Sequence, residues 1–386
     1  MKDERLLKRL VDRPLNRNET EFFVDRGEEL SALEKILKYY AFGIFGLCGR
    51  TGSGKTTLLN MLTEETQKIV RISIIYRDNS DAILYNLLYS LAEHFLKDDS
   101  KEIQKISQDV KEWLFEEVSI VRGFSLGLSM MATADLKGSK AHAPRFNVFK
   151  AHDYLQKMLD VAKKHYGKVS LLIDELDKEK KEDVIKILDS LKLELQQEDV
   201  LTIVTLPQSI YKEYIHDRLR MDGFGNLENI IKDVVFIRDL ENHHVKEMLI
   251  KRFSESLDWF EDLSILDMLA DFSDGNPRDA IWIAQKVVLE NISKNQLTVK
   301  DAIKSIQKVS KELIRTISLT DLQTKALKIL RGLTGSKEQF LIKLVENSFA
   351  RTTAYSIFDK FLEIGFIVPK ENGFKFSGKL SFVEEL

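Results

Sequence analysis

The segment GRTGSGKT, Gly49 to Thr56, is the feature that most restricts how this chain can fold. It matches G-x-x-x-x-G-K-[ST] and stands between a short apolar run (41–49) and a helical run, as that pattern requires. Glycines let backbone N–H groups converge on a phosphate, and the helix start adds partial positive charge. The loop therefore predicts a nucleotide-binding α/β fold. The residues expected to hold the nucleotide are Gly49, Arg50, Thr51, Gly52, Ser53, Gly54, Lys55, Thr56 and Thr57.

Further apolar runs at 68–76, 168–177, 199–209 and 233–240 are separated by helical patterns. Strands joined by helices predict a parallel sheet with helices on both faces and a ligand site at the carboxyl ends of the strands. One segment departs from this pattern. GFSLGLSMMATADL (123–136) partly alternates between apolar and small or polar residues, which predicts a hairpin-like insertion near 119–145. Its apolar residues would form a partner or self-association surface if exposed, or would extend the core of the domain.

Two strand ends carry the groups that phosphate chemistry needs. Lys55 is expected to reach the β- and γ-phosphates of ATP, and Thr56 to bind Mg²⁺. In LLIDELD, Asp174 ends an apolar strand and is placed to hold the metal, while Glu175 can polarise the attacking water. The alternative for Asp174 and Glu175 is that an acidic turn after a strand is only a solvated helix start. We interpret Asp177 as part of a solvated face. At the end of the next strand, Thr205 and then Gln208 are candidates to orient the water, with a structural role equally open.

A lone arginine follows a breakpoint far beyond the phosphate loop, in DGNPRDAIWIA. Pro277 favours a helix start, so Arg278 falls in the first helical turn. The surrounding all-helical region (241–316) is expected to form a lid, from which Arg278 would reach the phosphates and couple hydrolysis to lid position. The alternative is a surface arginine paired with Asp274 or Asp279.

The last region (317–386) has two short helices, an amphipathic helix (350–364) and two short strands, which is the winged-helix pattern. It holds ten lysines and arginines against eight aspartates and glutamates, so it is weakly basic. Duplex DNA is the predicted partner, and a module that contacts only protein is the alternative. The residues proposed to contact DNA are Arg351, Thr352, Thr353, Lys360 and Lys375.

The bulk composition limits the alternatives. A net charge of -3 argues against a grip on nucleic acid by the whole protein. A single cysteine, Cys48, excludes an intrachain disulfide and favours a reducing, cytoplasmic location, and we interpret it as a buried strand residue. No apolar run approaches the roughly 20 residues of a membrane span. The length suits an ATPase domain (1–240), a helical lid (241–316) and a winged helix (317–386).

Taken in order, GRTGSGKT, LLIDELD, Thr205, GNPR and the terminal winged helix resemble AAA+ ATPases. The resemblance is strongest to the origin-recognition and initiator branch and to the archaeal-type ATPases, and FVDR-GEEL (Phe23 to Leu30) resembles the element that packs by the adenine there. It implies ATP hydrolysis with Mg²⁺, with Lys55 and Arg278 acting at the phosphates. It also suggests Arg218 or Arg220 as an arginine finger that acts on a second copy.

Two departures keep other functions open. The insertion near 119–145 and the G-x-P of GNPR are similar to features of STAND signalling ATPases. The alternatives are therefore a STAND-like signalling or defence ATPase whose winged helix contacts protein, and a scaffold that binds nucleotide without hydrolysing it.

Overall fold

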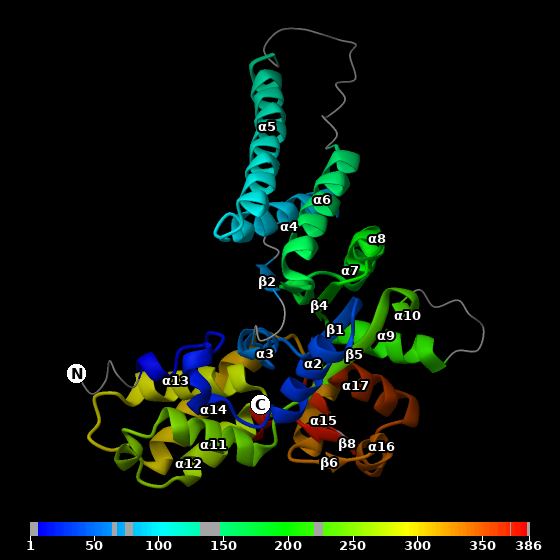
Figure 1. Ribbon diagram of the computed structural model, residues 1–386. Helices are drawn as coiled ribbons and strands as arrows, with labels where there is room; N and C mark the ends of the chain where they lie inside the picture. The colour runs from blue at the N-terminus through cyan, green and yellow to red at the C-terminus, as the bar shows by residue number, and fades with distance from the viewer. Residues whose placement is uncertain are drawn as a thin grey trace. The chain divides into compact units, whose positions relative to one another are not determined.

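The computed structural model describes residues 7–63, 68–73, 80–131, 147–219, 227–370 and 372–383, without the side chains of 80–83 and 117–131. The chain divides into two compact units. The sheet unit comprises Gly27–Thr51 and Lys55–Ile237. The C-terminal unit comprises Met1–Arg26, Gly52–Gly54 and Arg238–Leu386, so the tip of the phosphate loop groups with the C-terminal unit. Figure 1 labels the helices and strands of both units.

The sheet unit is built on five parallel strands in the order β2-β3-β4-β1-β5. Every residue of β1, β3 and β4 is buried, which is why their sequences are continuous apolar runs instead of alternating ones. In the register of the sheet, Ile173 of β3 pairs with Val204 of β4, so the polar residues that follow them, Asp174 and Thr205, reach the same edge. The strands are β1 (Gly43–Gly49), β2 (Lys68–Ser73), β3 (Val169–Asp174), β4 (Val200–Leu206) and β5 (Ile231–Ile237).

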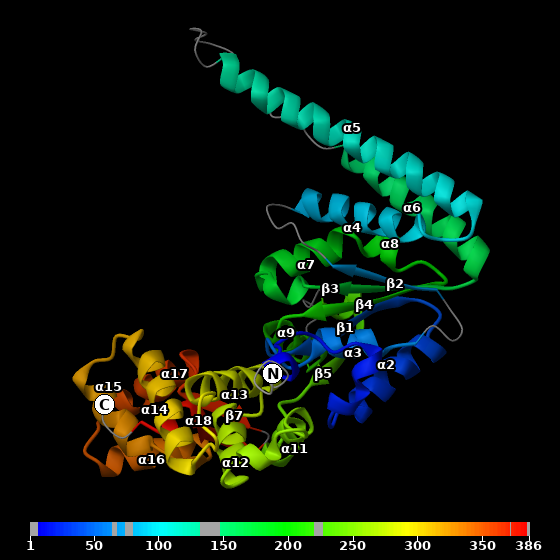
Figure 2. The ribbon, with the colours of Figure 1, turned by 90° about the vertical axis from the view of Figure 1, so that its left-hand side faces the viewer.

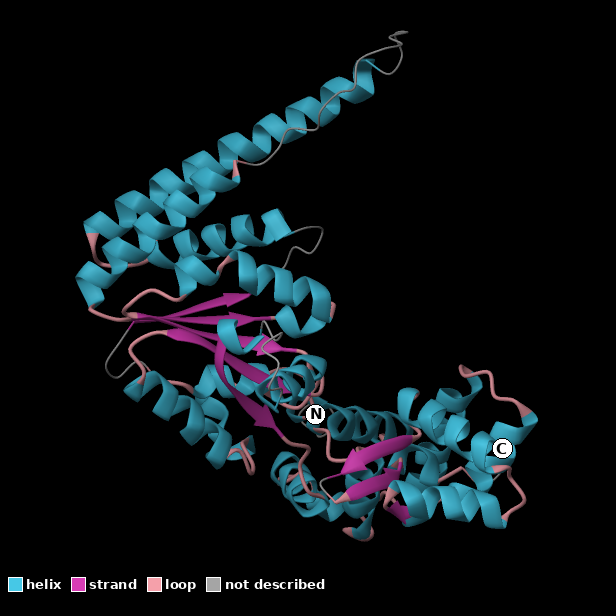
Figure 3. Ribbon diagram, turned by 90° about the vertical axis from the view of Figure 1, so that its right-hand side faces the viewer, coloured by secondary structure: helices cyan, strands magenta, loops and turns pink. Residues whose placement is uncertain are grey.

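Helices cover both faces of this sheet. Figures 2 and 3 show α4, α6, α7 and α8 on one face and α2 and α3 on the other. The large hydrophobic cluster of the unit lies on the first of these faces. It contains Ile44, Leu171 and Val204 from the strands, together with residues of α4, α6 and α7. The helices are α2 (Gly27–Tyr39), α3 (Lys55–Met61), α4 (Ser80–Phe95), α5 (Lys101–Met131), α6 (Val148–Tyr166), η2 (Leu176–Lys178), α7 (Lys181–Ser190), α8 (Lys192–Leu195), α9 (Gln208–Leu219) and α10 (Leu227–Ile230).

Helix α5 corrects one prediction. It runs without a break to Met131, so the segment predicted as an extended hairpin is helical over 123–131. Residues 123–131 contain two leucines and two methionines, which favour a helix, and none of them is β-branched, so partial alternation did not indicate a strand. Residues 132–146 and the side chains of 117–131 lie outside the described residues, and with them the predicted partner surface.

The C-terminal unit begins with helices after β5, as the sequence predicts. They pack around a hydrophobic cluster that contains Phe272, Ile283 and, from the N-terminal segment, the fully buried Leu10. Phe260 and Leu297 form an isolated parallel bridge that ties the segment after η3 to the segment before α14. The helices are η1 (Arg17–Phe22), α11 (Asn242–Arg252), η3 (Leu257–Trp259), α12 (Ser264–Phe272), α13 (Pro277–Asn291) and α14 (Val299–Arg315).

The end of the chain has its own hydrophobic cluster, in which Phe340, Phe358 and Phe376 are fully buried. Three helices, α15 to α17, accompany a small antiparallel sheet of order β6-β8-β7, shown in magenta in Figure 3, and β6 lies between the first two of them in the chain. The predicted fold class, a parallel α/β sheet followed by a helical region and a winged helix, is confirmed. The elements are α15 (Asp321–Leu330), β6 (Thr334–Gly335), α16 (Lys337–Glu346), α17 (Arg351–Glu363), β7 (Ile367–Lys370), β8 (Gly373–Phe376) and α18 (Gly378–Ser381).

The predicted division into three domains stays a prediction. The structure separates the hydrophobic clusters of the lid and the winged helix, yet both belong to one compact unit, which also includes the N-terminal segment. None of the helices in the described part of the chain is long and apolar enough to cross a membrane.

Candidate nucleotide site

The phosphate loop turns sharply between β1 and α3. Gly52 and Gly54 have φ values of +85° and +103°, a region that side chains other than glycine rarely adopt. Ser53 between them is 1% exposed, and its hydroxyl has no hydrogen-bond partner among the described atoms. A buried donor without a partner is costly, and a phosphate oxygen would satisfy it. The loop therefore fits an anion by its own local geometry.

Lys55 is 5% exposed and is held entirely by the chain. Its Nζ donates to the carbonyl oxygens of Gly49 at 2.9 Å and Arg50 at 3.0 Å, and pairs with the Asp177 carboxylate at 2.9 Å. An ammonium has three donors, so all three are in use. To reach a phosphate, Lys55 must exchange at least one of these partners.

Asp177 is a site residue that the sequence interpretation missed. Its side chain is 11% exposed and faces Lys55 rather than solvent, so its assignment to a solvated face is wrong. The available signal was its place in LLIDELD, three residues after the end of β3, within the same acidic turn as the two predicted acids.

The ends of β3 and β4 are joined by a buried hydrogen bond. The Thr205 hydroxyl donates to Asp174 Oδ1 at 2.9 Å, and the Glu175 N–H donates to the same oxygen at 2.8 Å. Thr205 is fully buried and Asp174 is 8% exposed. The two bonds fix the carboxylate and leave Oδ2 outside the described hydrogen bonds. One oriented carboxylate together with the Thr56 hydroxyl suits Mg²⁺, which is commonly bound by one or two carboxylates plus substrate phosphates.

Glu175 lies in a strained turn. Its φ of +75° and ψ of −4° are left-handed, which costs about 1–2 kcal/mol for a residue other than glycine. Its carboxylate is 29% exposed and pairs with Lys178. Strained backbone of this kind is frequent at functional sites. Here it occurs at Glu175, the residue whose carboxylate is predicted to polarise water.

The predicted arginine lies at the start of α13, where Pro277 is in the first turn and Asn276 is the N-cap, its side chain accepting from the Arg278 N–H at 3.0 Å. This turn touches the tip of the phosphate loop within the C-terminal unit. A Cβ built on Gly52 would lie 2.7 Å from both Arg278 Cβ and Asn276 Oδ1. Gly52 is thus required by contact as well as by its φ.

The guanidinium of Arg278 pairs with a carboxylate that the sequence did not suggest. Its Nε lies 3.2 Å from the oxygens of Asp12 in the N-terminal segment. The alternative partners, Asp274 and Asp279, are bound instead by groups of the winged helix. The contacts of Arg278 with both Gly52 and Asp12 are long-range in sequence, and no local pattern pointed to them.

Nearby, the FVDR-GEEL segment supports the loop. Arg26, 6% exposed, has Nη2 at 3.4 Å from the Ser53 carbonyl oxygen. Asp25, with a φ of +47°, pairs with His244 at 2.8 Å. The sequence indicated this segment as an adenine-side element but did not single out Arg26.

The remaining candidates are dispersed. Arg218 donates to the Lys232 carbonyl oxygen at 2.8 Å and stacks over Tyr214, while Arg220 lies outside the described residues. Gln208 begins α9. Cys48 is fully buried, and burial raises the pKa of its thiol to about 12, in agreement with a structural role.

The predicted DNA contacts also differ among themselves. Arg351 and Thr352 are exposed in the first turn of α17, and Thr353 is half-buried. Lys360 is exposed and pairs with Glu363 of its own helix. Lys375 is not free, because its ammonium pairs with Asp271 of the lid.

These features together define a P-loop ATPase. They are a parallel sheet, a phosphate loop that turns at glycines, a buried lysine in that loop, and an aspartate at the end of a neighbouring strand whose carboxylate is fixed by hydrogen bonds. Comparison with known families matches residues 23–283 to an ATPase domain found predominantly in Archaea. The match covers more than half of the chain, and the chain belongs to this ATPase family.

Solved structures are similar to this chain. A Walker-type ATPase of Pyrococcus abyssi is 17% identical, with 97% of this chain and 98% of that chain covered and a TM-score of 0.52. The RuvB Holliday junction branch migration motor of Thermotoga maritima is 16% identical over 95% of each chain, with a TM-score of 0.40. No curated protein matches the chain. At these identities the similarity concerns the fold alone.

Proposed function

We propose that this ATPase hydrolyses ATP with Mg²⁺ and uses the nucleotide state to set the position of its lid. The observation that carries the proposal is the contact of Asn276 and Arg278 with Gly52, because it brings the first turn of a lid helix to the loop that binds phosphate. Thr56 and Asp174 would hold the metal, which supplies positive charge to the phosphates. Glu175 would orient the attacking water, and Thr205 would fix Asp174.

Arg278 would then exchange Asp12 for phosphate when ATP binds. The Asp12 pair is about 40% exposed on both sides, so breaking it costs little, on the order of 0–1 kcal/mol. A charged partner that is easily released suits a residue that must respond to nucleotide. Glu175→Gln should keep ATP binding and abolish turnover, and Arg278→Ala should lower turnover. Unchanged turnover in both variants, measured by phosphate release, would refute the proposal.

For the winged helix we propose binding of duplex DNA through the start of α17. Arg351 and Thr352 are exposed at a helix N-terminus, where N–H groups and a cation can meet the phosphate backbone, and no described residue pairs with Arg351. Arg351, Thr352, Thr353 and Lys360 remain the proposed contacts. We leave Lys375 out because two lid carboxylates already lie near its ammonium.

A second function is favoured by a specific observation. Lys370, Lys375 and Lys379 of the winged helix all bind lid residues, as expected if the winged helix is a protein-contact module of a STAND-like signalling ATPase. In that function ATP would control assembly, and a second copy would be the partner, with Arg218 or Arg220 acting on its nucleotide. The cytoplasmic location stays a prediction from the single cysteine.

One set of measurements separates the two functions. Retardation of duplex DNA by the full chain at low salt, and ATPase rate with and without DNA, test the first. Arg351→Ala should weaken retention several-fold, whereas the control Lys304→Ala, a lid lysine that is also exposed, should not. If the full chain does not retard duplex DNA at low salt, or if the two variants weaken retardation equally, the proposal of DNA binding is wrong. Molecular mass measured with ATP and with ADP tests the second, because it requires a larger assembly with ATP.

A further inference from the structure

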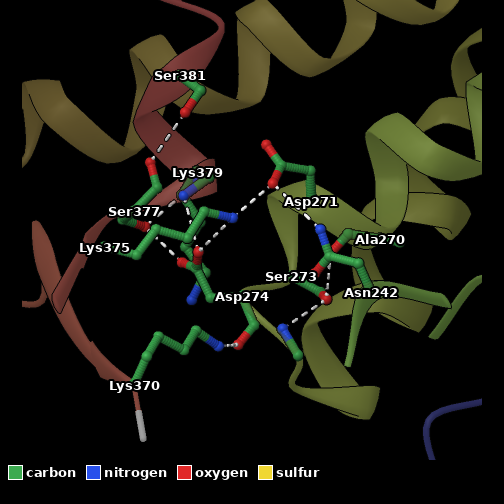
Figure 4. Close-up of polar contacts among 12 residues, drawn as sticks. Asn242, Ala270, Asp271, Ser273, Asp274, Lys370, Lys375, Ser377, Lys379 and Ser381 are labelled. Carbon is green, nitrogen blue, oxygen red and sulfur yellow. Dashed lines mark hydrogen bonds and ion pairs between the residues drawn. The ribbon is translucent and has the colours of Figure 1, made fainter. Parts of the chain in front are cut away.

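The turn between α12 and α13 contains a buried carboxylate whose partners all come from the winged helix. Asp274 is 1% exposed and has a left-handed φ of +54°. The Ser377 hydroxyl donates to its Oδ2 at 2.6 Å, and the Gly378 N–H donates to its Oδ1 at 2.8 Å. Lys370 donates to its carbonyl oxygen at 2.9 Å. Figure 4 shows Ser377, Lys370 and Lys375 around Asp274.

The surrounding contact is packed rather than loose. A Cβ on Gly378 would overlap the Asp271 carbonyl oxygen, so α18 begins directly against the end of α12. Two further ion pairs, Lys375 with Asp271 and Lys379 with Asp279, join the winged helix to the lid, and the Lys375 ammonium also lies 3.8 Å from Asp274 Oδ1. The buried Asp274 carboxylate receives its hydrogen bonds from the winged helix. The position of the turn between α12 and α13 therefore depends on the winged helix.

The same turn leads directly to the phosphate loop. Gly275 accepts a hydrogen bond from the Leu240 N–H at 2.8 Å, and a Cβ at Gly275 would overlap the Leu240 carbonyl oxygen. The next residues, Asn276 and Arg278, are those that touch Gly52. Only three residues therefore separate Asp274, whose carboxylate the winged helix holds, from Arg278 at the loop tip.

We propose that Asp274 is a positioning residue for ATP hydrolysis: the winged helix, through Ser377 and Gly378, holds its carboxylate and thereby fixes the turn that brings Asn276 and Arg278 to the phosphate loop. The proposal rests on the proposed role of Arg278 at the phosphates. It makes the C-terminal module a part of the ATPase although its residues Ser377 and Gly378 act only through Asp274. A ligand that draws the winged helix away from the lid would lower turnover.

The test uses the full chain and compares kcat and KM for ATP among single variants and a double variant. Asp274→Asn replaces an acceptor by a donor toward Ser377 or Gly378, and Ser377→Ala removes one donor with a minimal change. Asp279→Asn is the matched control, because it breaks another bond between the lid and the winged helix without involving Asp274. We expect Asp274→Asn to lower kcat about tenfold and Ser377→Ala to lower it less, with Asp279→Asn near wild type.

The double variant with Arg278→Ala decides whether Asp274 acts through the arginine. If it does, Asp274→Asn adds no further loss of kcat to Arg278→Ala, whereas a purely structural effect would multiply. Multiplying losses, or equal losses in Asp274→Asn and Asp279→Asn, would overturn the inference. If Asp274→Asn does not fold, Ser377→Ala combined with Arg278→Ala gives the same comparison. A normal rate for Arg278→Ala alone would instead refute the proposed function.

Discussion

Replacing Glu175 by glycine should relieve backbone strain, and so make the protein more stable than the Glu175→Ala variant, while it abolishes turnover. The residue has a φ of +75°, and an L-residue in this region costs about 1–2 kcal/mol relative to a right-handed one. Glycine removes that cost. It also makes the unfolded chain more flexible, which lowers the free energy of unfolding by about 0.4–1 kcal/mol. The net gain from relief of strain is about 0.5–1 kcal/mol. For a unit of this size that corresponds to a rise in Tm of about 1–4 °C.

Glu175→Ala is the matched control. Both variants lose the exposed ion pair with Lys178, worth about 0–1 kcal/mol, but alanine keeps the Cβ and hence the strain. The difference in Tm between the glycine and alanine variants therefore isolates the backbone conformation. Loss of a general base should lower kcat by about 10²–10⁴ in both.

The assay combines thermal unfolding followed by circular dichroism with steady-state phosphate release. A glycine variant no more stable than the alanine variant would show that the turn carries no strain. Turnover near wild type in either variant would remove Glu175 from its proposed role, whatever the stabilities. Higher stability of the glycine variant together with lost turnover would show that Glu175 serves the activity and lowers the stability of the fold.

Three further predictions concern single side chains. Asp177→Ala frees the Lys55 ammonium, so ATP should bind about tenfold more tightly by calorimetry, and weaker binding would contradict the competition between carboxylate and phosphate. Thr205→Val removes the bond to Asp174, so the unfolding free energy in urea should fall by about 1 kcal/mol and half-maximal ATPase activity should need more Mg²⁺; an unchanged Mg²⁺ titration would separate Thr205 from the metal. Cys48, with a pKa raised to about 12, stays protonated at pH 8, so a thiol reagent should label it only as fast as the sheet unit unfolds, and rapid labelling of the folded chain would contradict its burial.

Local sequence patterns predicted most of the fold because they report local physics. The run Gly43–Gly49 followed by GRTGSGKT predicted a buried strand, a glycine turn and a helix start in the observed order. Pro277 predicted the start of α13. The pattern misled at 123–131, where partial alternation suggested strands and a continuous helix formed, because a short stretch of leucine, methionine and small residues fits either period.

The candidate site was predicted by residue type but not by partner. The sequence placed Asp174 and Thr205 at strand ends, which the parallel sheet brings to one edge, and Lys55 in the loop that follows another strand. It did not show that Asp177 binds Lys55 or that Asp12 binds Arg278. The local sequence pattern does not determine in which direction these side chains point.

What the sequence alone determined is an ATPase sheet, its phosphate loop and the order of its helical and winged-helix regions, since turns, strand burial and helix starts depend on neighbours a few residues away. The tertiary structure decided which charges are neutralised. Asp274 shows the reason: its partner Ser377 lies 103 residues further along the chain. A desolvated carboxylate must take whichever donors the folded chain brings to it, and only the packing of distant segments determines which these are.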